Sequence, residues 1–170
     1  MKTSIEQVKG EALANELESI LEEYGSRLKA ISNEDYYTKV TSTVWSKIET
    51  LGSLVDATHN CLQHVMQARL GAKPKTYYSR EAWVRCIDYQ HYEKDSLISL
   101  FFVLNQHLIH VLRGVAPSDF YKACNSASKG TYHRCLKDIV RAHLEQVRFY
   151  LGDLCKIENG QRIHLKMLYS

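Results

Sequence analysis

Residues 45–70 read WSKIETLGSLVDATHNCLQHVMQARL, and this stretch decides the fold class. Ser46 and Glu49 have the spacing of a capping box, in which each side chain binds a backbone N–H of the first helical turn. Apolar residues then recur at steps of three and four, which is the period of a helix with one buried face. These apolar positions are Ile48, Leu51, Leu54, Val55, Leu62, Val65 and Met66. Gly71 follows the last of them, so we expect a helix over 47–70 that packs against other helices.

Three further stretches show the helical period and predict helices over about residues 5–31, 96–113 and 132–151. Together with 47–70 they predict an all-α protein built as a bundle of four main helices. The stretch 96–113 is apolar almost all round. We therefore expect it to be the most buried helix, with Leu104 facing the core.

The segments outside these helices carry shorter signals. Residues 71–94 are rich in aromatic side chains, so we expect them to cross over the bundle and to include a short helix capped by Ser79. Thr131 and Gly152 are residue types that begin and end helices. An Asn-Gly pair within residues 156–163 predicts a small C-terminal hairpin.

Composition narrows the class of protein. The chain has 170 residues, 45% of them hydrophobic, and two prolines, which predicts a single domain over 1–170. Its formal charge is +3 with Lys and Arg spread along the chain, so nothing indicates a nucleic-acid partner. No signal segment and no run of about 18 apolar residues is present, so we expect neither export nor a membrane partner. Five widely spaced cysteines without a C-x-x-C pair argue against disulfides and favour a reducing cytoplasm.

Four motifs follow one another in a recognisable order. They are WSKxExLGxLxD at 45–56, YSREAWV at 78–84, LNQHLIHV at 104–111 and T-x(6)-D-x-V-R at 131–141. In this order and at these separations they resemble the DinB-like (DinB/YfiT-type) superfamily. The resemblance implies an up-down-down-up four-helix bundle with a long crossover between the second and third helices. It also implies a bacterial protein, and the family's name implies damage-inducible expression.

The resemblance also implies a metal site, which this sequence does not match. The family's metal is held by one histidine on the second main helix and an H-x-x-x-H pair on the fourth. Aligning the motifs puts these positions at Ser53, Ala142 and Gln146. Serine and glutamine are poor ligands for zinc or nickel and alanine is none, so we predict no cofactor.

Small residues in place of imidazoles should leave space, because rigid helices close only partly around a large-to-small change. We therefore expect a pocket between the second, third and fourth main helices that holds water or a small polar ligand. Its expected lining is Ser53, Asp56, Asn60, His107, Ala142, His143 and Gln146. On this interpretation the chain is a ligand-binding or scaffold protein of DinB-like type, and a homodimer stays open as an arrangement.

The alternative to a binding or scaffold protein is an enzyme with a rearranged site. It would be a metal-dependent hydrolase, or a transferase that uses a low-molecular-weight thiol, with zinc or nickel. The residues available to such a site are Asp56, His59, His107, His110 and His143. The simpler interpretation makes His107 and His143 hydrogen-bonded core residues and leaves the other histidines at helix edges or on the surface. Likewise, Asp56 and Asp138 are either an acid pair or two surface aspartates, and the sequence contains no G-x-S-x-G, phosphate-loop or H-E-x-x-H motif.

Overall fold

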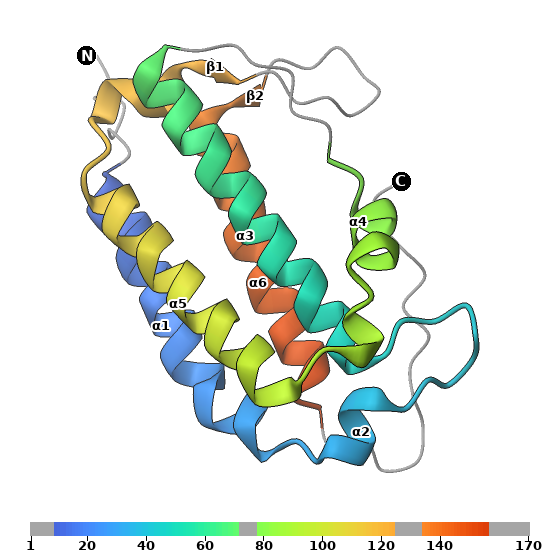
Figure 1. Ribbon diagram of the computed structural model, residues 1–170. Coiled ribbons are helices and arrows are strands. Elements are labelled where there is room, and N and C mark those ends of the chain that lie inside the picture. Colours follow the sequence, from blue (N-terminus) through green and yellow to red (C-terminus); the bar gives the residue numbers. More distant parts are fainter. Residues whose placement is uncertain (1–8, 72–77, 125–133, 157–170) are drawn as a thin grey trace.

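The computed structural model describes residues 9–71, 78–124 and 134–156, and this part of the chain is mostly helical (Figure 1). The helices are α1 (Gly10–Ala30), α2 (Asn33–Tyr37), α3 (Lys47–Leu70), α4 (Arg80–Ile87), α5 (Lys94–Arg113) and α6 (Leu136–Leu154). Two 3-10 helices, η1 (Tyr89–His91) and η2 (Pro117–Tyr121), and two antiparallel strands of two residues each, β1 (Ala123–Cys124) and β2 (Arg134–Cys135), complete the described elements. The predicted all-α class is confirmed.

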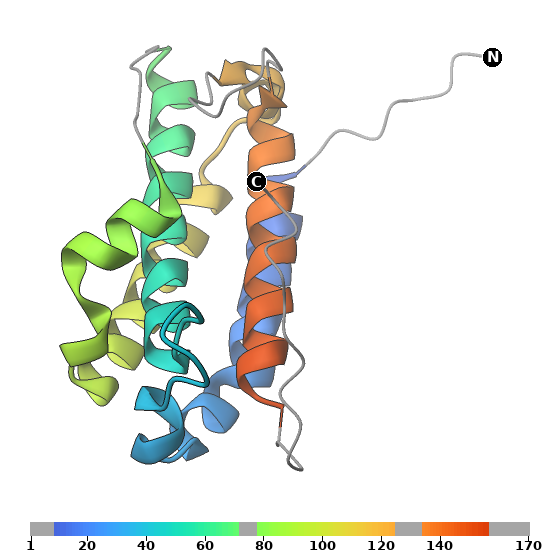
Figure 2. The same cartoon turned by 90° about the vertical axis from the view of Figure 1, so that its right-hand side faces the viewer.

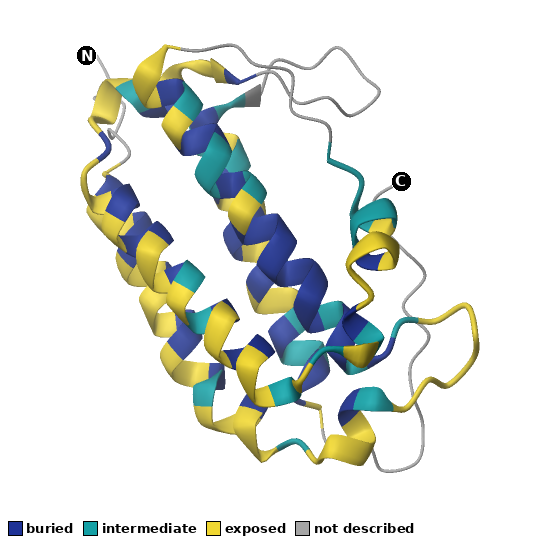
Figure 3. Ribbon diagram, in the orientation of Figure 1, coloured by how far each residue is buried: buried dark blue, intermediate teal, exposed yellow. Residues whose placement is uncertain are grey.

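The four long helices α1, α3, α5 and α6 lie side by side, and the short helix α4 lies outside them (Figures 1 and 2). Both α1 and α3 contact α5 and α6. Apolar side chains with no exposed surface come from all four helices, so the core lies between them (Figure 3). Among these side chains are Leu17, Ile20, Leu51, Leu54, Leu97, Leu108, Val140 and Val147.

Helix α3 has the limits that its sequence predicts. The Ser46 hydroxyl accepts a hydrogen bond from the Glu49 backbone N–H, and the Ser46 backbone N–H donates to the Glu49 carboxylate at 2.8 Å. The helix ends at Gly71, which has a φ of 68°, a conformation that glycine adopts without steric cost. Fourteen of the 24 residues of α3 are buried, against eight of the 20 residues of α5. The prediction that 96–113 is the most buried helix is therefore wrong, and α3 is the central one.

Helix α5 still has a broad apolar surface. Leu104 is half-buried at the edge of the core, which corrects its expected position inside the core. The helix begins at Lys94, two residues before the predicted start, because the Glu93 carboxylate accepts from the backbone N–H groups of Asp95 and Ser96. Among the described helices, α5 alone is long and apolar enough to cross a membrane, and 44% of that stretch is buried inside the protein.

Helix α6 begins and ends later than predicted. The chain enters it from the ladder between β1 and β2, and the Leu136 N–H donates to the Lys122 carbonyl at 3.1 Å, so the helix cannot begin at 132. Gly152 does not stop it, because a helix tolerates one glycine where packing continues, and α6 runs on to Leu154. The expected cap at Thr131, the start of the first helix at 5–8 and the hairpin at 156–163 lie outside the described residues, apart from Lys156.

The connecting segments contain one predicted helix and one unexpected helix. Helix α4 occupies the predicted place in the crossover, but the Ser79 side chain makes no cap hydrogen bond, and only its carbonyl accepts from the Trp83 N–H at 2.9 Å. Helix α2 lies in the connection between α1 and α3, outside every helix that the sequence predicts. Ser32 caps α2 by accepting from the Asp35 N–H, and the buried Tyr36 fixes it by donating to the Leu28 carbonyl at 3.1 Å.

Candidate functional site

A row of polar side chains runs along the side of α3 that meets α6 and the crossover. The helical period of four residues places them on facing sides of the two helices. We call this set the polar seam; it consists of Ser53, Asp56, Asn60 and His64 of α3, Tyr78 and Arg80 of the crossover, and His143, Gln146 and Tyr150 of α6.

A pocket of about 160 Å³ opens within this seam. Its lining consists of Ala57, Asn60, Cys61, His64, Tyr78, Ile139, Ala142, His143 and Gln146. Ala142 is the one exposed member of the lining, so the pocket reaches solvent beside it. A water molecule takes up about 30 Å³ of liquid, so the pocket has room for about five waters or for one small molecule.

Arg80 closes one end of the seam. Its Nη2 donates to Ser53 Oγ and its Nη1 donates to Tyr150 Oη, both at 2.7 Å. The centre of its guanidinium lies 4.2 Å from the centroid of the Tyr150 ring and 5.2 Å from that of Trp45. Cation–π contact and charged hydrogen bonds therefore join the crossover to α3 and α6 through one side chain.

Asp56 is buried next to this arginine and has one satisfied oxygen. Tyr89 Oη donates to Asp56 Oδ1 at 2.7 Å, whereas Oδ2 has no partner in the described part of the protein. Burial raises the pKa of Asp56, and the hydrogen bond from Tyr89 and the charge of Arg80 act in the opposite direction. The Tyr89 ring reaches this position because Gly52 has no Cβ, which would collide with the ring atoms.

Two buried histidines face the pocket from opposite sides. His143 and His64 are each 5% exposed, and burial lowers both pKa values, that of His143 to about 4. Both rings are therefore neutral at pH 7, because desolvation disfavours the imidazolium. His143 Nε2 and His64 Nδ1 have no hydrogen-bond partner among the described residues. His143 is therefore a buried residue as the simpler interpretation predicts, but its Nε2 atom lacks the hydrogen bond that this interpretation requires.

The unpartnered polar atoms of the protein gather at this seam. In the described part of the chain, five buried side-chain atoms lack a hydrogen-bond partner. They are Asp56 Oδ2, His64 Nδ1, Tyr78 Oη, Arg80 Nε and His143 Nε2, and every one belongs to the polar seam. Native proteins leave few such atoms unsatisfied. Three of the five, those of His64, Tyr78 and His143, belong to residues that line the pocket, which marks it as a place that receives water or a ligand.

The structure places some of the seven expected residues at the pocket and others elsewhere. Asn60, Ala142, His143 and Gln146 line it, and Ser53 and Asp56 are buried along the same side of α3. His107 is exposed on α5, away from this lining, which corrects both its expected place at the pocket and its interpretation as a core histidine. The pocket therefore lies between α3, α6 and the crossover, and α5 contributes none of its lining.

Sequence reasoning also missed three residues that the structure brings to the seam. His64, which we expect at a helix edge or on the surface, is buried, and Tyr78 and Arg80 belong to a crossover for which the sequence predicts no part in the site. A signal for Arg80 exists in the sequence, because an arginine surrounded by aromatic residues is typical of a stacked cation. Asp138 is exposed and accepts from the Cys135 thiol at 2.9 Å, so it forms no acid pair with the buried Asp56.

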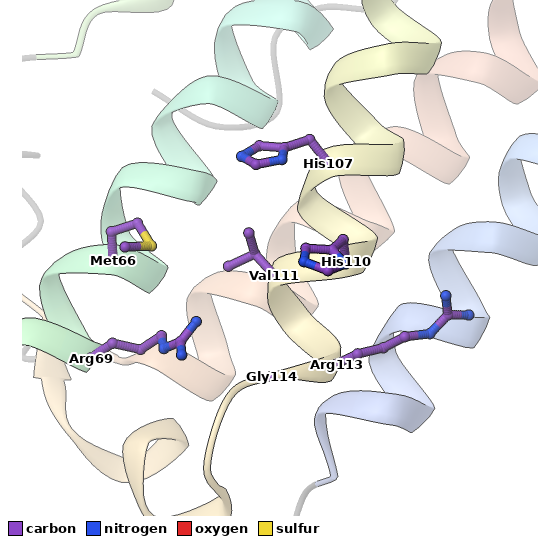
Figure 4. Close-up of a pocket in the computed structure, with 7 residues that line it drawn as sticks. All are labelled: Met66, Arg69, His107, His110, Val111, Arg113 and Gly114. Carbon is purple, nitrogen blue, oxygen red and sulfur yellow. The ribbon is translucent and has the colours of Figure 1, made fainter.

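His107 lines a second hollow, an open one of about 650 Å³ between the ends of α3 and α5 (Figure 4). Its walls are Met66, Arg69, His107, His110, Val111, Arg113 and Gly114. Arg113 is engaged away from the hollow, since its guanidinium pairs with Glu18 at 2.8 Å and with Glu11 at 3.4 Å. No buried side chain with an unpartnered polar atom lies among these walls, in contrast to the polar seam.

The histidines considered for a rearranged metal centre do not meet. His107 and His110 are exposed on α5, His59 is exposed and bonded to Gln63 at 2.9 Å, and His143 is buried in the seam. Within residues 9–71, 78–124 and 134–156, no group of three His, Cys, Asp or Glu side chains has a geometry that fits a metal ion.

Comparison of the chain with protein-family models, curated proteins and solved structures found no match in any of the three.

Proposed function

We propose that this protein is a DinB-like up-down-down-up bundle that binds a small polar ligand in the pocket between α3 and α6 and lacks the family's metal chemistry. The course of the chain supports the topology, because α3 and α5 run one way and α1 and α6 run the other way in Figure 1. The crossover that contains α4 links α3 to α5, as the proposed topology requires.

The observation that carries the ligand-binding function is the convergence of unpartnered polar atoms on one pocket. A buried donor or acceptor without a partner costs about 1–3 kcal/mol, so a fold without a use for the pocket gains stability by filling it with apolar side chains. Here three lining residues, His64, Tyr78 and His143, each present such an atom. These atoms supply fixed hydrogen-bonding positions for a guest.

The donor set does not fit a resident metal. Ser53, the position aligned with the family's first ligand, accepts a hydrogen bond from the Arg80 guanidinium and donates to the Thr50 carbonyl, each at 2.7 Å. A divalent cation at Ser53 would therefore lie next to a fixed positive charge, which costs free energy in a partly buried site. The aligned positions on α6, Ala142 and Gln146, add no strong ligand. No observation favours the hydrolase or thiol-transferase alternative over a binding protein.

Saturation-transfer NMR with a library of small polar fragments tests the proposal. We expect a subset of fragments to bind wild-type protein and to lose binding in Ala142→Phe, whose ring covers the mouth of the pocket. Ala12→Phe is the matched control, because Ala12 is also an exposed helical alanine but lies on α1 and outside the pocket. Fragments that bind equally well to both variants, or a library without any binder, would contradict the proposed function.

A further inference from the structure

We infer that the pocket selects a small uncharged molecule that carries both a hydrogen-bond donor and an acceptor, such as a primary amide or a hydroxy compound. The inference deepens the proposed function and rests on it. It follows from three properties of the lining: its charge, its hydrogen-bonding chemistry and its size.

The charge of the lining excludes an ionic guest. None of the nine lining residues is Asp, Glu, Lys or Arg. The nearby charged residues Arg80 and Asp56 lie outside this lining, and their hydrogen bonds go to Ser53, Tyr150 and Tyr89. An anion or cation that entered would lose its hydration without meeting a counter-charge in the lining, which is the costly case of charge burial.

The hydrogen-bonding groups of the lining all have two roles. Asn60 and Gln146 carry an amide, which donates through nitrogen and accepts through oxygen, and the Tyr78 hydroxyl does both. A neutral imidazole donates at one nitrogen and accepts at the other, and the rings of His64 and His143 each present an unpartnered nitrogen. Such a lining is complementary to a ligand that also donates and accepts, because neither kind of group is then left unpaired.

The size of the pocket indicates how much of a ligand it can enclose. A volume of about 160 Å³ corresponds to roughly five waters, so a guest of a few non-hydrogen atoms fills it. Ala57 and Ile139 in the same lining offer an apolar surface to a small alkyl group beside the polar end of the ligand.

Three nearly isosteric probes test the charge selectivity directly: acetamide, acetate and acetamidinium, which carry charges of zero, minus one and plus one. We expect acetamide to shift the ring resonances of His64 and His143 saturably at pH 7, and the two ions to leave them unchanged at the same concentration and ionic strength. Ala142→Phe should abolish the acetamide shifts, and Ala12→Phe should retain them.

The pH dependence of the binding gives a second readout. The titratable lining groups are Cys61, His64, Tyr78 and His143, with Asp56 and Arg80 adjacent. Burial raises the pKa of Cys61 to about 12 and that of Tyr78 above its usual value, and it lowers the pKa of both histidines. The affinity for acetamide should therefore stay constant between pH 6.5 and 8, whereas an anion that bound through an imidazolium would bind tenfold more tightly per unit fall in pH.

Different results would contradict the selectivity for uncharged ligands and the proposed ligand-binding function. Binding of acetate or acetamidinium in preference to acetamide would overturn the uncharged class and leave the pocket as a binding site. Failure of all three probes would overturn the inference, and the fragment screen with Ala142→Phe then decides the proposed function independently.

Discussion

Arg80→Met is predicted to destabilise the protein by about 1.5–3 kcal/mol, because this side chain joins three elements. Methionine retains length and apolar bulk but removes the charge and both hydrogen bonds. The bond to fully buried Ser53 is worth about 1.5–3 kcal/mol, as expected for a charged donor. The bond and ring contact to half-exposed Tyr150 add about 1 kcal/mol, since water replaces them in part. Removing the unpartnered Nε returns about 1 kcal/mol.

Urea unfolding followed by circular dichroism at pH 7 measures this difference. Arg85→Met is the matched control, because Arg85 is exposed on the same helix and has no seam contact, so its replacement should change stability by less than about 0.5 kcal/mol. Equal effects of the two substitutions would refute the view that Arg80 fixes the crossover to α3 and α6. A change in the slope of the unfolding transition alone would point to the unfolded state instead.

Three further perturbations probe the core and the seam. Gly52→Ala should cost about 1–3 kcal/mol in urea titrations, because its Cβ collides with the ring of Tyr89; an unchanged midpoint would show that the ring moves freely. Leu104→Ala should cost only about 1–2 kcal/mol, as a half-buried leucine, whereas fully buried Leu97→Ala should cost about 2–5 kcal/mol, and the reverse order would contradict the assigned face of α5. Burial lowers the pKa of His143 to about 4 in the folded protein, whereas in the unfolded chain it is near 6.5. Between these pH values the unfolded state binds the proton and the folded state does not, so the free energy of unfolding decreases as the pH falls from 6.5 toward 4. From pH 7 to pH 5 this group should remove roughly 2 kcal/mol from the unfolding free energy, and His143→Gln should lose that part of the acid sensitivity; an identical pH dependence would place His143 in water.

The sequence predicted both ends of α3 because local residues mark them. In α3, a capping box at Ser46 and Glu49 and a glycine in the left-handed conformation at Gly71 fix both ends locally, so no tertiary information was needed. Helix α6 lacks such a local signal at its start, because Leu136 follows the β1–β2 ladder directly. Its beginning is set by a strand pair distant in sequence, which residue periodicity does not reveal.

The seam was predictable only where a helix has one clear apolar side. The stripes of α3 and α6 define their inward faces, and the neighbouring polar residues Asn60, His143 and Gln146, which the sequence predicts beside them, lie in the lining of one pocket. Helix α5 is apolar nearly all round, so its rotation was ambiguous and His107 was assigned to the wrong face. Arg80 comes from a crossover whose path depends on tertiary packing, which explains why its role was missed.

The free-energy cost of leaving the polar atoms of the seam without hydrogen-bond partners is large relative to the stability of a protein. Three of these atoms belong to residues that line the pocket, and at about 1–3 kcal/mol each they amount to roughly 3–9 kcal/mol, which is comparable with the unfolding free energy of a typical domain. A fold cannot keep such atoms dry, so the pocket must be hydrated whenever no ligand is bound. A ligand that enters therefore competes with waters that donate and accept at fixed places, and it binds only if it reproduces those hydrogen bonds. An apolar molecule fails this condition, while an uncharged molecule with a donor and an acceptor meets it. The buried donors and acceptors of the pocket each need a hydrogen-bond partner. That need makes the seam costly to build, and it also makes the pocket selective.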